Sequence, residues 1–305
     1  MRDTFVKTLL VEAKANPDII LMTGDLGFGV LDTFQRELPE QFINSGVNEQ
    51  AMMGMAAGYA STGKRVFVYS IGNFPTLRCL EQIRNDVCLM NNPVVVVSVG
   101  AGYAYGSQGY THHALEDIAV LRALPNMDVI VPADPHETVG ITQYLASTKK
   151  PSYLRLGKSN EPNIHTSNVK CNPGRVNPLV AGDAGTLIFS GSIGTIALSS
   201  HEKLLSESIS TSVVSMPFVS HVDVDFLKDA VRKGPIVVIE EHSYRGGVGS
   251  AILETLSHEA LNARIALVAS DQNNLSQIGD QEFLRNQNGI TVENVISKFK
   301  ALSAK

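Results

Sequence analysis

Residues 44–59 read Asn-Ser-Gly-Val-Asn-Glu-Gln-Ala-Met-Met-Gly-Met-Ala-Ala-Gly-Tyr and combine a turn, one acidic residue and an uncharged segment. Ser45 and Asn48 are of the types that cap helix N-termini, and Gly46 between them lets the chain turn sharply. From position 51 to position 60 there is no charged residue. The stretch therefore predicts a helix that is either fully buried or packed against another subunit.

Glu49 is the only ionisable residue at the start of this helix. An acidic residue in a first turn commonly does no more than complement the positive end of the helix dipole, and that explanation stays open here. Gly54 and Gly58 are four residues apart and share one helix face, so a second helix could approach closely there. The same helix is therefore a candidate both for chemistry and for subunit contact.

The composition describes a globular protein with a large buried fraction. The chain has 305 residues, 44% of them hydrophobic and 18% charged, which is enough for two domains of ordinary size. A net charge of −5 leaves no basic surface for nucleic acid. No apolar run approaches the roughly 18 residues that span a bilayer, and the first residues do not resemble a signal peptide. A cytoplasmic location without membrane association is expected, with Cys79, Cys88 and Cys171 reduced.

Over the first 160 residues, short strand-like runs alternate with helical periods. The predicted strands cover residues 18–23, 65–71, 93–99, 128–131 and 152–156, and the predicted helices cover residues 3–15, 49–60, 75–90, 115–124 and 134–147. Residues 93–99 are almost pure valine, which is typical of a strand buried on both faces of a parallel sheet. This βαβ series predicts a doubly wound sheet with helices on both faces.

A change of composition and periodicity marks a boundary after the first series of strands and helices. Asn, Pro, Thr and Ser accumulate and the periodicity is lost, so residues 161–178 are predicted to be a linker. A second alternating series follows, with strands at 186–189, 211–215, 236–239 and 265–268 and helices at 194–206, 223–232, 247–257 and 292–301. The fold class is therefore α/β, with one doubly wound domain at residues 1–160 and another at residues 179–305.

Because ligands of open parallel sheets bind beyond the carboxyl ends of the strands, the segments that follow each strand are the candidate sites. The loop at residues 100–113 reads Gly-Ala-Gly-Tyr-Ala-Tyr-Gly-Ser-Gln-Gly-Tyr-Thr-His-His. It lacks the lysine of a Walker loop, and its two histidines have no partner at a metal-binding spacing. Two interpretations stay open: a tyrosine-packed surface loop, or a lid whose histidine contacts a substrate or moves a proton. His242, between a strand and a glycine-rich helix start, is expected to be structural.

Four segments together resemble the C-terminal half of transketolases, which are thiamine diphosphate enzymes. They are Gly-Val-Asn-Glu-Gln at 46–50, Leu-Glu-Gln-Ile-Arg-Asn-Asp at 80–86, Gly-Tyr-Thr-His-His-Ala-Leu-Glu-Asp-Ile-Ala at 109–119 and Leu-Arg-Ala-Leu-Pro-Asn-Met at 121–127. In this order and spacing they are similar to the separate C-terminal subunit of transketolases split into two genes. The resemblance covers essentially the whole chain. It implies a pyrimidine-binding domain, a C-terminal domain, and transfer of a two-carbon ketol unit between phosphorylated or nucleotide-linked sugars.

The resemblance implies that Glu49 activates thiamine diphosphate. A glutamate hydrogen-bonded to the aminopyrimidine ring favours the tautomer that removes the proton from the thiazolium carbon. Burial behind the uncharged helix is expected to raise the pKa of such a carboxyl group. His112 matches a histidine that contacts the substrate near the reacting carbon, which makes it the second catalytic candidate.

On the cofactor side, the resemblance also implies contacts from Asp25 and Phe74. Asp25 matches an aspartate near the cofactor, and Phe74 matches an aromatic residue that packs on the aminopyrimidine. Ile71 and Leu80 stand where the family has a second aromatic residue and a tyrosine. Both remain apolar, so they still offer a bed for the pyrimidine.

On the substrate side, the resemblance implies that Arg155 binds a phosphate, a role suited to its fixed fork of donors. Gly100 replaces a histidine of the family, and Gln108 replaces an aspartate that reads a sugar hydroxyl. His113, adjacent to His112, is a further substrate-binding candidate. The replacements predict a substrate other than the ordinary pentose and hexose phosphates.

The chain contains no Gly-Asp-Gly, the motif with which the family holds the diphosphate through magnesium. The resemblance therefore implies a partner, a separate N-terminal transketolase subunit that carries Gly-Asp-Gly and holds the diphosphate and Mg²⁺, with no metal ligand in this chain. A two-plus-two heterotetramer is expected, with the Gly54 and Gly58 helix as the candidate symmetric contact.

Two alternatives to this function stay open. The β subunit of a 2-oxo-acid dehydrogenase shares both domains and the glutamate, although the segment at 111–118 and Arg155 favour transketolase. A non-catalytic binding or regulatory homologue is the other alternative. The retained carboxyl group of Glu49 argues against it, because an inactive descendant need not keep that group.

Overall fold

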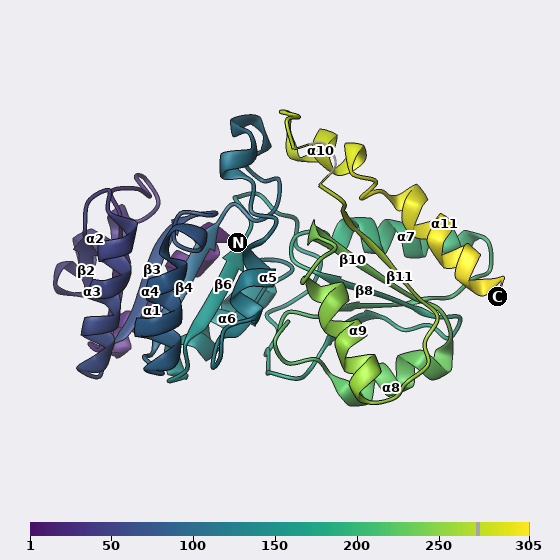
Figure 1. Ribbon diagram of the computed structural model, residues 1–305, viewed down its shortest axis with the longest axis horizontal. Coiled ribbons are helices and arrows are strands. Elements are labelled where there is room, and N and C mark those ends of the chain that lie inside the picture. Colours follow the sequence, from purple (N-terminus) through teal and green to yellow (C-terminus); the bar gives the residue numbers. More distant parts are fainter. Residues whose placement is uncertain (273–274, 305) are drawn as a thin grey trace.

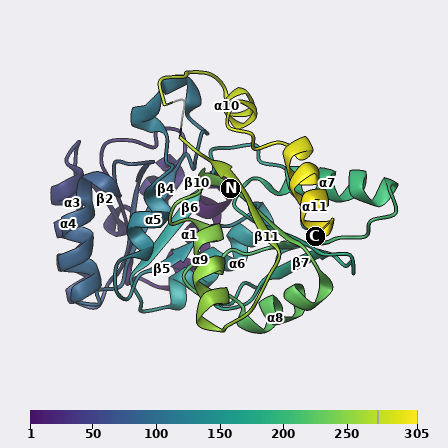
Figure 2. The ribbon, with the colours of Figure 1, turned by 45° about the vertical axis from the view of Figure 1, so that its right-hand side comes forward.

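Two α/β domains stand side by side in the computed structural model, which describes residues 1–272 and 275–304 (Figure 1). The first domain runs from purple to teal in Figure 1, and the second runs from teal-green to yellow. Each domain has a central sheet flanked by helices, and the view in Figure 2 shows the same arrangement. The predicted fold class of two doubly wound α/β domains is confirmed.

The first sheet has six strands in the order β2-β1-β3-β4-β6-β5, and every pair is parallel. The strands are β1 Ile19–Thr23, β2 Phe42–Asn44, β3 Arg65–Ile71, β4 Val94–Val99, β5 Asp128–Ile130 and β6 Ser152–Leu156. β1 and β4 are buried along their whole length, which explains their continuous apolar runs. β2 was not predicted, because three residues, two half-buried and one exposed, are too short an apolar run to detect.

Helices cover both faces of this sheet. They are α1 Arg2–Ala15, α2 Asp32–Glu37, α3 Glu49–Ser61, α4 Leu80–Gln82, α5 Asp117–Arg122 and α6 Pro135–Ser147, with short turns η1 Pro39–Gln41, η4 Gly106–Gln108 and η5 Tyr110–His112. The long α-helix predicted at residues 75–90 is irregular instead. It consists of the 3₁₀ turn η2 Leu77–Cys79, the single turn α4 and the π-helical segment η3 Ile83–Leu89. Apolar spacing did not reveal this irregularity, because each of the three segments covers only one or two turns.

The second sheet has five strands in the order β11-β10-β8-β9-β7, with β7 antiparallel to β9. Its strands are β7 Asn177–Val180, β8 Thr186–Ser190, β9 Ser212–Ser215, β10 Ile236–Ser243 and β11 Ile265–Ser270. Its helices are α7 Gly194–Ser206, α8 Val224–Lys233, α9 Val248–His258, α10 Gln281–Gln287 and α11 Val292–Ser303. β7 begins inside the predicted linker. Its proline is tolerated because β7 is an edge strand, and the same proline hides the strand in the sequence.

A buried charge network joins the two domains around Asp117. Arg155 Nε donates to Asp117 Oδ2 at 2.7 Å, and the Tyr153 hydroxyl donates to the same oxygen at 2.5 Å. From the second domain, His242 brings its Nε2 to 3.7 Å from Asp117 Oδ1. Burial lowers the pKa of His242 to about 4, so the ring is neutral near pH 7. The structural role expected of His242 agrees with this position.

A second buried carboxylate, Glu240, holds the start of α9. Its Oε2 accepts the N–H of Val248 at 2.7 Å and its Oε1 accepts the N–H of Gly249 at 2.9 Å. Burial raises the pKa of Glu240 from the ordinary 4.5 to about 7. Between these two pH values the folded chain keeps a proton that the unfolded chain has lost. This group therefore lowers stability as the pH rises through that window.

We expect Glu240→Gln to flatten the pH dependence of stability, because the variant keeps an acceptor at this position but cannot ionise. The measurement is the urea midpoint of unfolding at pH 5, 6, 7 and 8 for the wild type and the variant. The variant should gain stability relative to the wild type as the pH rises. Glu207→Gln, at an exposed glutamate of the same domain, is the control and should run parallel to the wild type. Equal slopes for Glu240→Gln and the wild type would contradict the assignment.

Candidate functional site

Glu49 is the first residue of α3, and only 6% of it is exposed. Asn48 caps this helix, with its side-chain oxygen accepting the N–H of Ala51 at 3.4 Å. The carboxylate of Glu49 is not alone, because Arg78 Nη1 donates to its Oε2 at 2.9 Å. Sequence reasoning missed Arg78, and its place just beyond the end of β3 was the one signal that could have suggested it.

From Glu49, a line of contacts crosses the carboxyl end of the first sheet. The guanidinium carbon of Arg78 lies 4.7 Å from the ring centroid of Phe74. The Phe74 ring in turn meets the ring of His112 edge-on, at 5.3 Å between centroids. Arg78 is 49% exposed, so solvent or a ligand reaches the middle of this line. Three predicted site residues, Glu49, Phe74 and His112, are thus brought together through one that was not predicted.

Asp25 lies at the end of the neighbouring strand β1 and is tied to the turn that precedes Glu49. Its N–H donates to Asn44 Oδ1 at 2.9 Å, and Asn44 Nδ2 donates to Asp25 Oδ1 at 3.2 Å. Asn44 Oδ1 also accepts the N–H of Gly46 at 3.0 Å. A Cβ atom at Gly24 would stand 3.2 Å from the carbonyl oxygen of Gly46, so the two loops touch. Asp25 remains exposed at this edge of the sheet.

Ile71 and Leu80 flank Phe74 in the chain. Ile71 is the last residue of β3, where it is paired with Val99 of β4, and Leu80 is the first residue of α4. Both are half-buried, and Leu80 packs against the core of the first domain. Each therefore combines a fixed position with apolar surface that is still accessible.

The two adjacent histidines of the loop occupy different environments. His113 is buried, with its ring edge-on to Tyr103 at 5.3 Å and its Nε2 3.4 Å from the carbonyl oxygen of Gly106. Its own carbonyl oxygen accepts Asn73 Nδ2 at 2.5 Å, and burial lowers the pKa of its ring. His112 is half-buried and faces Phe74. The geometry separates a histidine that supports the loop from one that faces the site.

The replacements at Gly100 and Gln108 have different surroundings. Gly100 has φ +96°, and a Cβ atom there would stand 2.2 Å from ring atoms of Tyr105. The Tyr105 ring therefore fills the space that a larger residue at position 100 would need. Gln108 is exposed at the end of η4. The Tyr105 ring and the exposed Gln108 side chain therefore shape this part of the loop.

Arg155, the predicted phosphate-binding residue, lies buried at the junction of the two domains. Its side chain is buried, and its Nη2 donates to the carbonyl oxygens of Ala114 at 2.6 Å and Glu241 at 3.0 Å. Its Nε is held by Asp117, as described above. Removing one partner from such a buried pair is strongly unfavourable. Arg155 therefore joins the two domains, and its binding of a phosphate stays a prediction.

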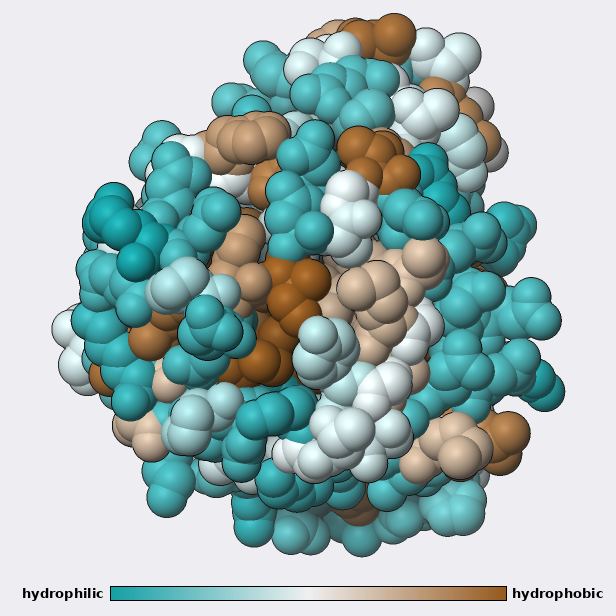
Figure 3. Space-filling model, turned by 90° about the vertical axis from the view of Figure 1, so that its left-hand side faces the viewer, coloured by the Kyte–Doolittle hydropathy of each residue, from teal (hydrophilic) through white to brown (hydrophobic). Residues whose placement is uncertain are grey.

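The outer face of α3 is apolar and accessible. Met55 and Tyr59 of α3 are exposed, and Leu89 and Met90 of the adjoining helix are 70% and 67% exposed. Figure 3 shows hydrophobic side chains gathered near the middle of this side of the molecule, with hydrophilic residues around them. A Cβ atom at Gly54 would meet nothing within 4 Å. Contiguous exposed apolar surface of this kind is typical of a protein contact.

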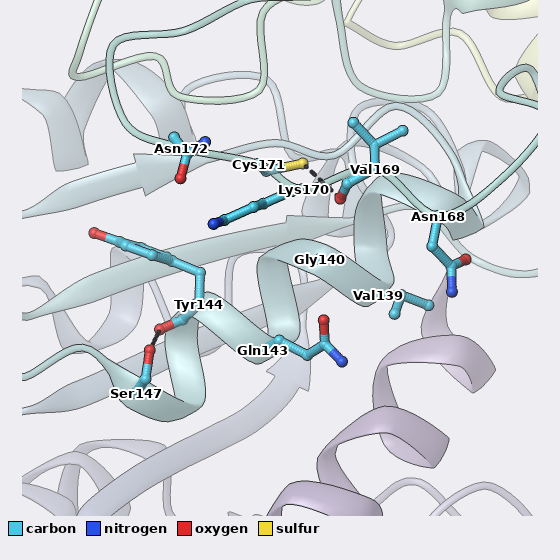
Figure 4. A pocket seen from close by; sticks show the side chains of 10 residues that line it. All are labelled: Val139, Gly140, Gln143, Tyr144, Ser147, Asn168, Val169, Lys170, Cys171 and Asn172. Atoms are coloured by element: carbon cyan, nitrogen blue, oxygen red, sulfur yellow. Dashed lines mark hydrogen bonds between the residues drawn. The ribbon is translucent and has the colours of Figure 1, made fainter.

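A separate groove of about 500 Å³ lies between α6 and the linker (Figure 4). Tyr144 from α6 and Lys170 from the linker line it, together with the side chain of Cys171. Burial raises the pKa of the Cys171 thiol to about 12, which leaves it unreactive near pH 7. None of the candidate site residues lines this groove, so it is distinct from the line that begins at Glu49.

Residues 1–272 and 275–304 contain neither a metal-binding cluster nor a membrane-spanning helix. No cluster of three or more His, Cys, Asp or Glu side chains in this part of the chain is arranged to hold a metal ion. Within the same ranges, every helix is too short or too polar to cross a membrane.

Comparison with known proteins gives a consistent family. The chain matches the family models "Transketolase, pyrimidine binding domain" over residues 1–163 and "Transketolase, C-terminal domain" over residues 174–295. An apulose-4-phosphate transketolase subunit of Phocaeicola vulgatus is 36% identical over 267 residues, which cover 87% of this chain and 86% of the relative. The putative transketolase C-terminal section of Methanocaldococcus jannaschii is 35% identical over 268 residues, covering 87% and 84%.

A solved structure extends this likeness to the whole fold. It is described as a split gene transketolase, inactive beta4 tetramer, and it superimposes with a TM-score of 0.89 at 32% identity. The match covers 99% of this chain and 97% of that one. The resemblance inferred from the four sequence segments is thereby confirmed. The chain belongs to the thiamine-diphosphate-dependent transketolase family, as a C-terminal subunit of the split type.

Proposed function

We propose that this chain is the pyrimidine-side subunit of a two-component transketolase that transfers a two-carbon ketol unit between sugar substrates. The observation that carries the proposal is the line from Glu49 through Arg78 and Phe74 to His112. It sets a nearly buried carboxylate, an aromatic face and an imidazole at one edge of a parallel sheet, where ligands of such sheets bind.

The residues around Glu49 fit the pyrimidine half of thiamine diphosphate. When bound, this cofactor supplies the carbanion chemistry. Arg78 contacts Oε2 of Glu49, so the other carboxylate oxygen can share a proton with a ring nitrogen. Phe74 offers a ring for stacking, with Ile71 and Leu80 as apolar neighbours. The turns of α3 behind Glu49 contribute no other charged side chain to its surroundings.

A partner subunit completes the proposed site. The chain has no Gly-Asp-Gly motif, and its described residues form no metal-binding cluster, so the diphosphate and Mg²⁺ are assigned to an N-terminal subunit. Two observations on relatives support a two-component enzyme: one relative is named as a single subunit of a transketolase, and the solved β-chain tetramer is described as inactive. We assign the apolar face of α3 to the contact between subunits in a two-plus-two heterotetramer.

The substrate is proposed to be a sugar phosphate or nucleotide-linked sugar outside the common pentose and hexose phosphates. Tyr105 fills the space beside Gly100, and Gln108 stands exposed where the family has an aspartate. We assign Arg155 to the domain junction and not to a substrate phosphate, because its Nε and Nη2 are engaged there. Another group, from this chain or from the partner, must then recognise any phosphate.

We expect Glu49→Ala and Glu49→Gln each to lower kcat by at least about 100-fold, because neither variant can hold the proton of the pyrimidine ring. The measurement is ketol transfer by the reconstituted complex with thiamine diphosphate and Mg²⁺. Sedimentation of the same mixtures serves as the control, and assembly should match the wild type. Wild-type activity in a complex containing Glu49→Ala would refute this mechanism.

The two histidines should respond oppositely to replacement by alanine. His113→Ala should lower the free energy of unfolding by about 1–3 kcal/mol, because it empties a buried position between aromatic rings. His112→Ala should change stability little and instead reduce kcat/KM by about 100-fold, since its ring faces the site. Urea unfolding and steady-state kinetics on both variants separate the roles. The reverse pattern would show that His113 is the substrate-side residue.

Gly54→Leu should prevent association while the chain stays folded. No atom stands within 4 Å of a Cβ atom at this position, and replacing glycine inside a helix stabilises it by about 0.5–1 kcal/mol. Sedimentation velocity of the variant mixed with the partner subunit is the measurement. Gln143→Leu, at an exposed position of α6, is the matched control and should assemble normally. Full assembly of Gly54→Leu would exclude this face of α3 as the contact.

A further inference from the structure

The histidine loop, residues 100–113, is braced from outside by the second domain. Figures 1 and 2 both show it beside α10. A Cβ atom at Gly106 would stand 2.5 Å from Leu284 Cδ1, and one at Gly109 would stand 3.7 Å from Ile278 Cδ1. The loop itself contains only two single-turn 3₁₀ helices, which are too short to fix its shape alone. The second domain therefore adds contacts at the middle of the loop to those that the first domain makes at its two ends.

Glu241, near the end of β10, makes a charged contact with the loop backbone. Its Oε1 accepts the N–H of Tyr103 at 2.5 Å, a buried hydrogen bond between residues 138 positions apart. Gly102 has φ +59°, and a Cβ atom there would stand 2.3 Å from Glu241 Oε1. The carboxylate thus occupies the space that a side chain at position 102 would fill. A charged acceptor makes such a hydrogen bond stronger than a neutral one.

Two side chains of α10 hold this carboxylate in place. Gln281 Nε2 donates to Glu241 Oε1 at 2.9 Å and to Oε2 at 3.1 Å. Arg285 donates its Nε to Oε2, and its Nη2 donates to the carbonyl oxygen of Ser192 at 3.3 Å. Because a buried carboxyl group is costly without partners, these donors stabilise Glu241 in this position.

Tyr103 transmits this position to the two histidines. Its ring meets the ring of His113 edge-on at 5.3 Å, and its hydroxyl is 2.6 Å from Ser270 Oγ of the second domain. The next residue towards the site is His112, whose ring rests against Phe74. Glu241 acts on the site through Tyr103 and the loop, so it is a positioning residue.

We propose that Glu241, held by Gln281 and Arg285, positions the histidine loop, so that the second domain sets the geometry of the substrate side of the catalytic site. The catalytic part of this inference rests on the proposed transketolase function. The structural part concerns this chain alone, so two measurements separate them.

The first measurement is amide hydrogen exchange of residues 101–113 in the full chain. Glu241→Ala should lower the protection of these amides at least about tenfold, because the loop loses its anchor. Asp223→Ala is the matched control, since it removes the N-cap of α8 in the same domain, far from the loop in Figure 1. Unchanged protection in Glu241→Ala, or an equal loss in Asp223→Ala, would overturn the proposal whether or not the complex is an enzyme.

The second measurement is ketol transfer by the complex of the full chain with its N-terminal partner, thiamine diphosphate and Mg²⁺. Glu241→Ala should raise the KM for the sugar donor and lower kcat/KM roughly 10- to 100-fold, with cofactor affinity unchanged. Glu241→Gln keeps an oxygen for the Tyr103 N–H and should recover a large part of the activity. Equal activity of Glu241→Ala and Asp223→Ala would overturn the catalytic role. An inactive wild-type complex would instead count against the proposed function, and the exchange result would still decide the positioning.

Discussion

Parallel pairing is the constraint on which the rest of this structure depends. It puts the carboxyl ends of β1, β3 and β4 at one edge of the first sheet, so the segments that follow them must meet there. Asp25, Phe74 and the histidine loop come from these segments. α3 adds Glu49 at its buried N-terminus, and a residue that no pattern marked, Arg78, connects the carboxylate to the aromatic ring.

The second domain makes direct contacts with the segments at this edge of the first sheet. Asp117 and Arg155 form a buried ion pair at the junction, and Arg155 also donates to the backbone of Glu241. The side chain of Glu241 then reaches the backbone of the histidine loop. One continuous set of buried polar contacts therefore runs from the junction to the loop. Buried hydrogen bonds restrict the motion of the groups they join, which suits a site that must hold a substrate in one orientation.

The apolar face of α3 and the missing Gly-Asp-Gly motif are complementary features of a split enzyme. The first offers hydrophobic surface to another chain, and the second underlies the proposal that a partner subunit holds the diphosphate. Because Glu49 stands at the N-terminal end of α3, a subunit that covers this helix would come close to the carboxylate. Assembly and catalysis are therefore expected to be coupled through the same helix.

The sequence by itself determined the α/β class, the two domains, the helix at Glu49 and the family, because strand and helix periodicity and short motifs are local properties. It could not reveal β2 or β7, which have too short or too interrupted an apolar run, and it predicted the helix after β3 without its 3₁₀ and π-helical turns. Only the tertiary structure decided that Arg78 pairs with Glu49, that Arg155 is buried at the junction and that His112 and His113 face different ways. Those outcomes depend on contacts between side chains that are far apart in the sequence. Burial brings these side chains together, and each buried charge then needs a partner of opposite charge or a hydrogen bond.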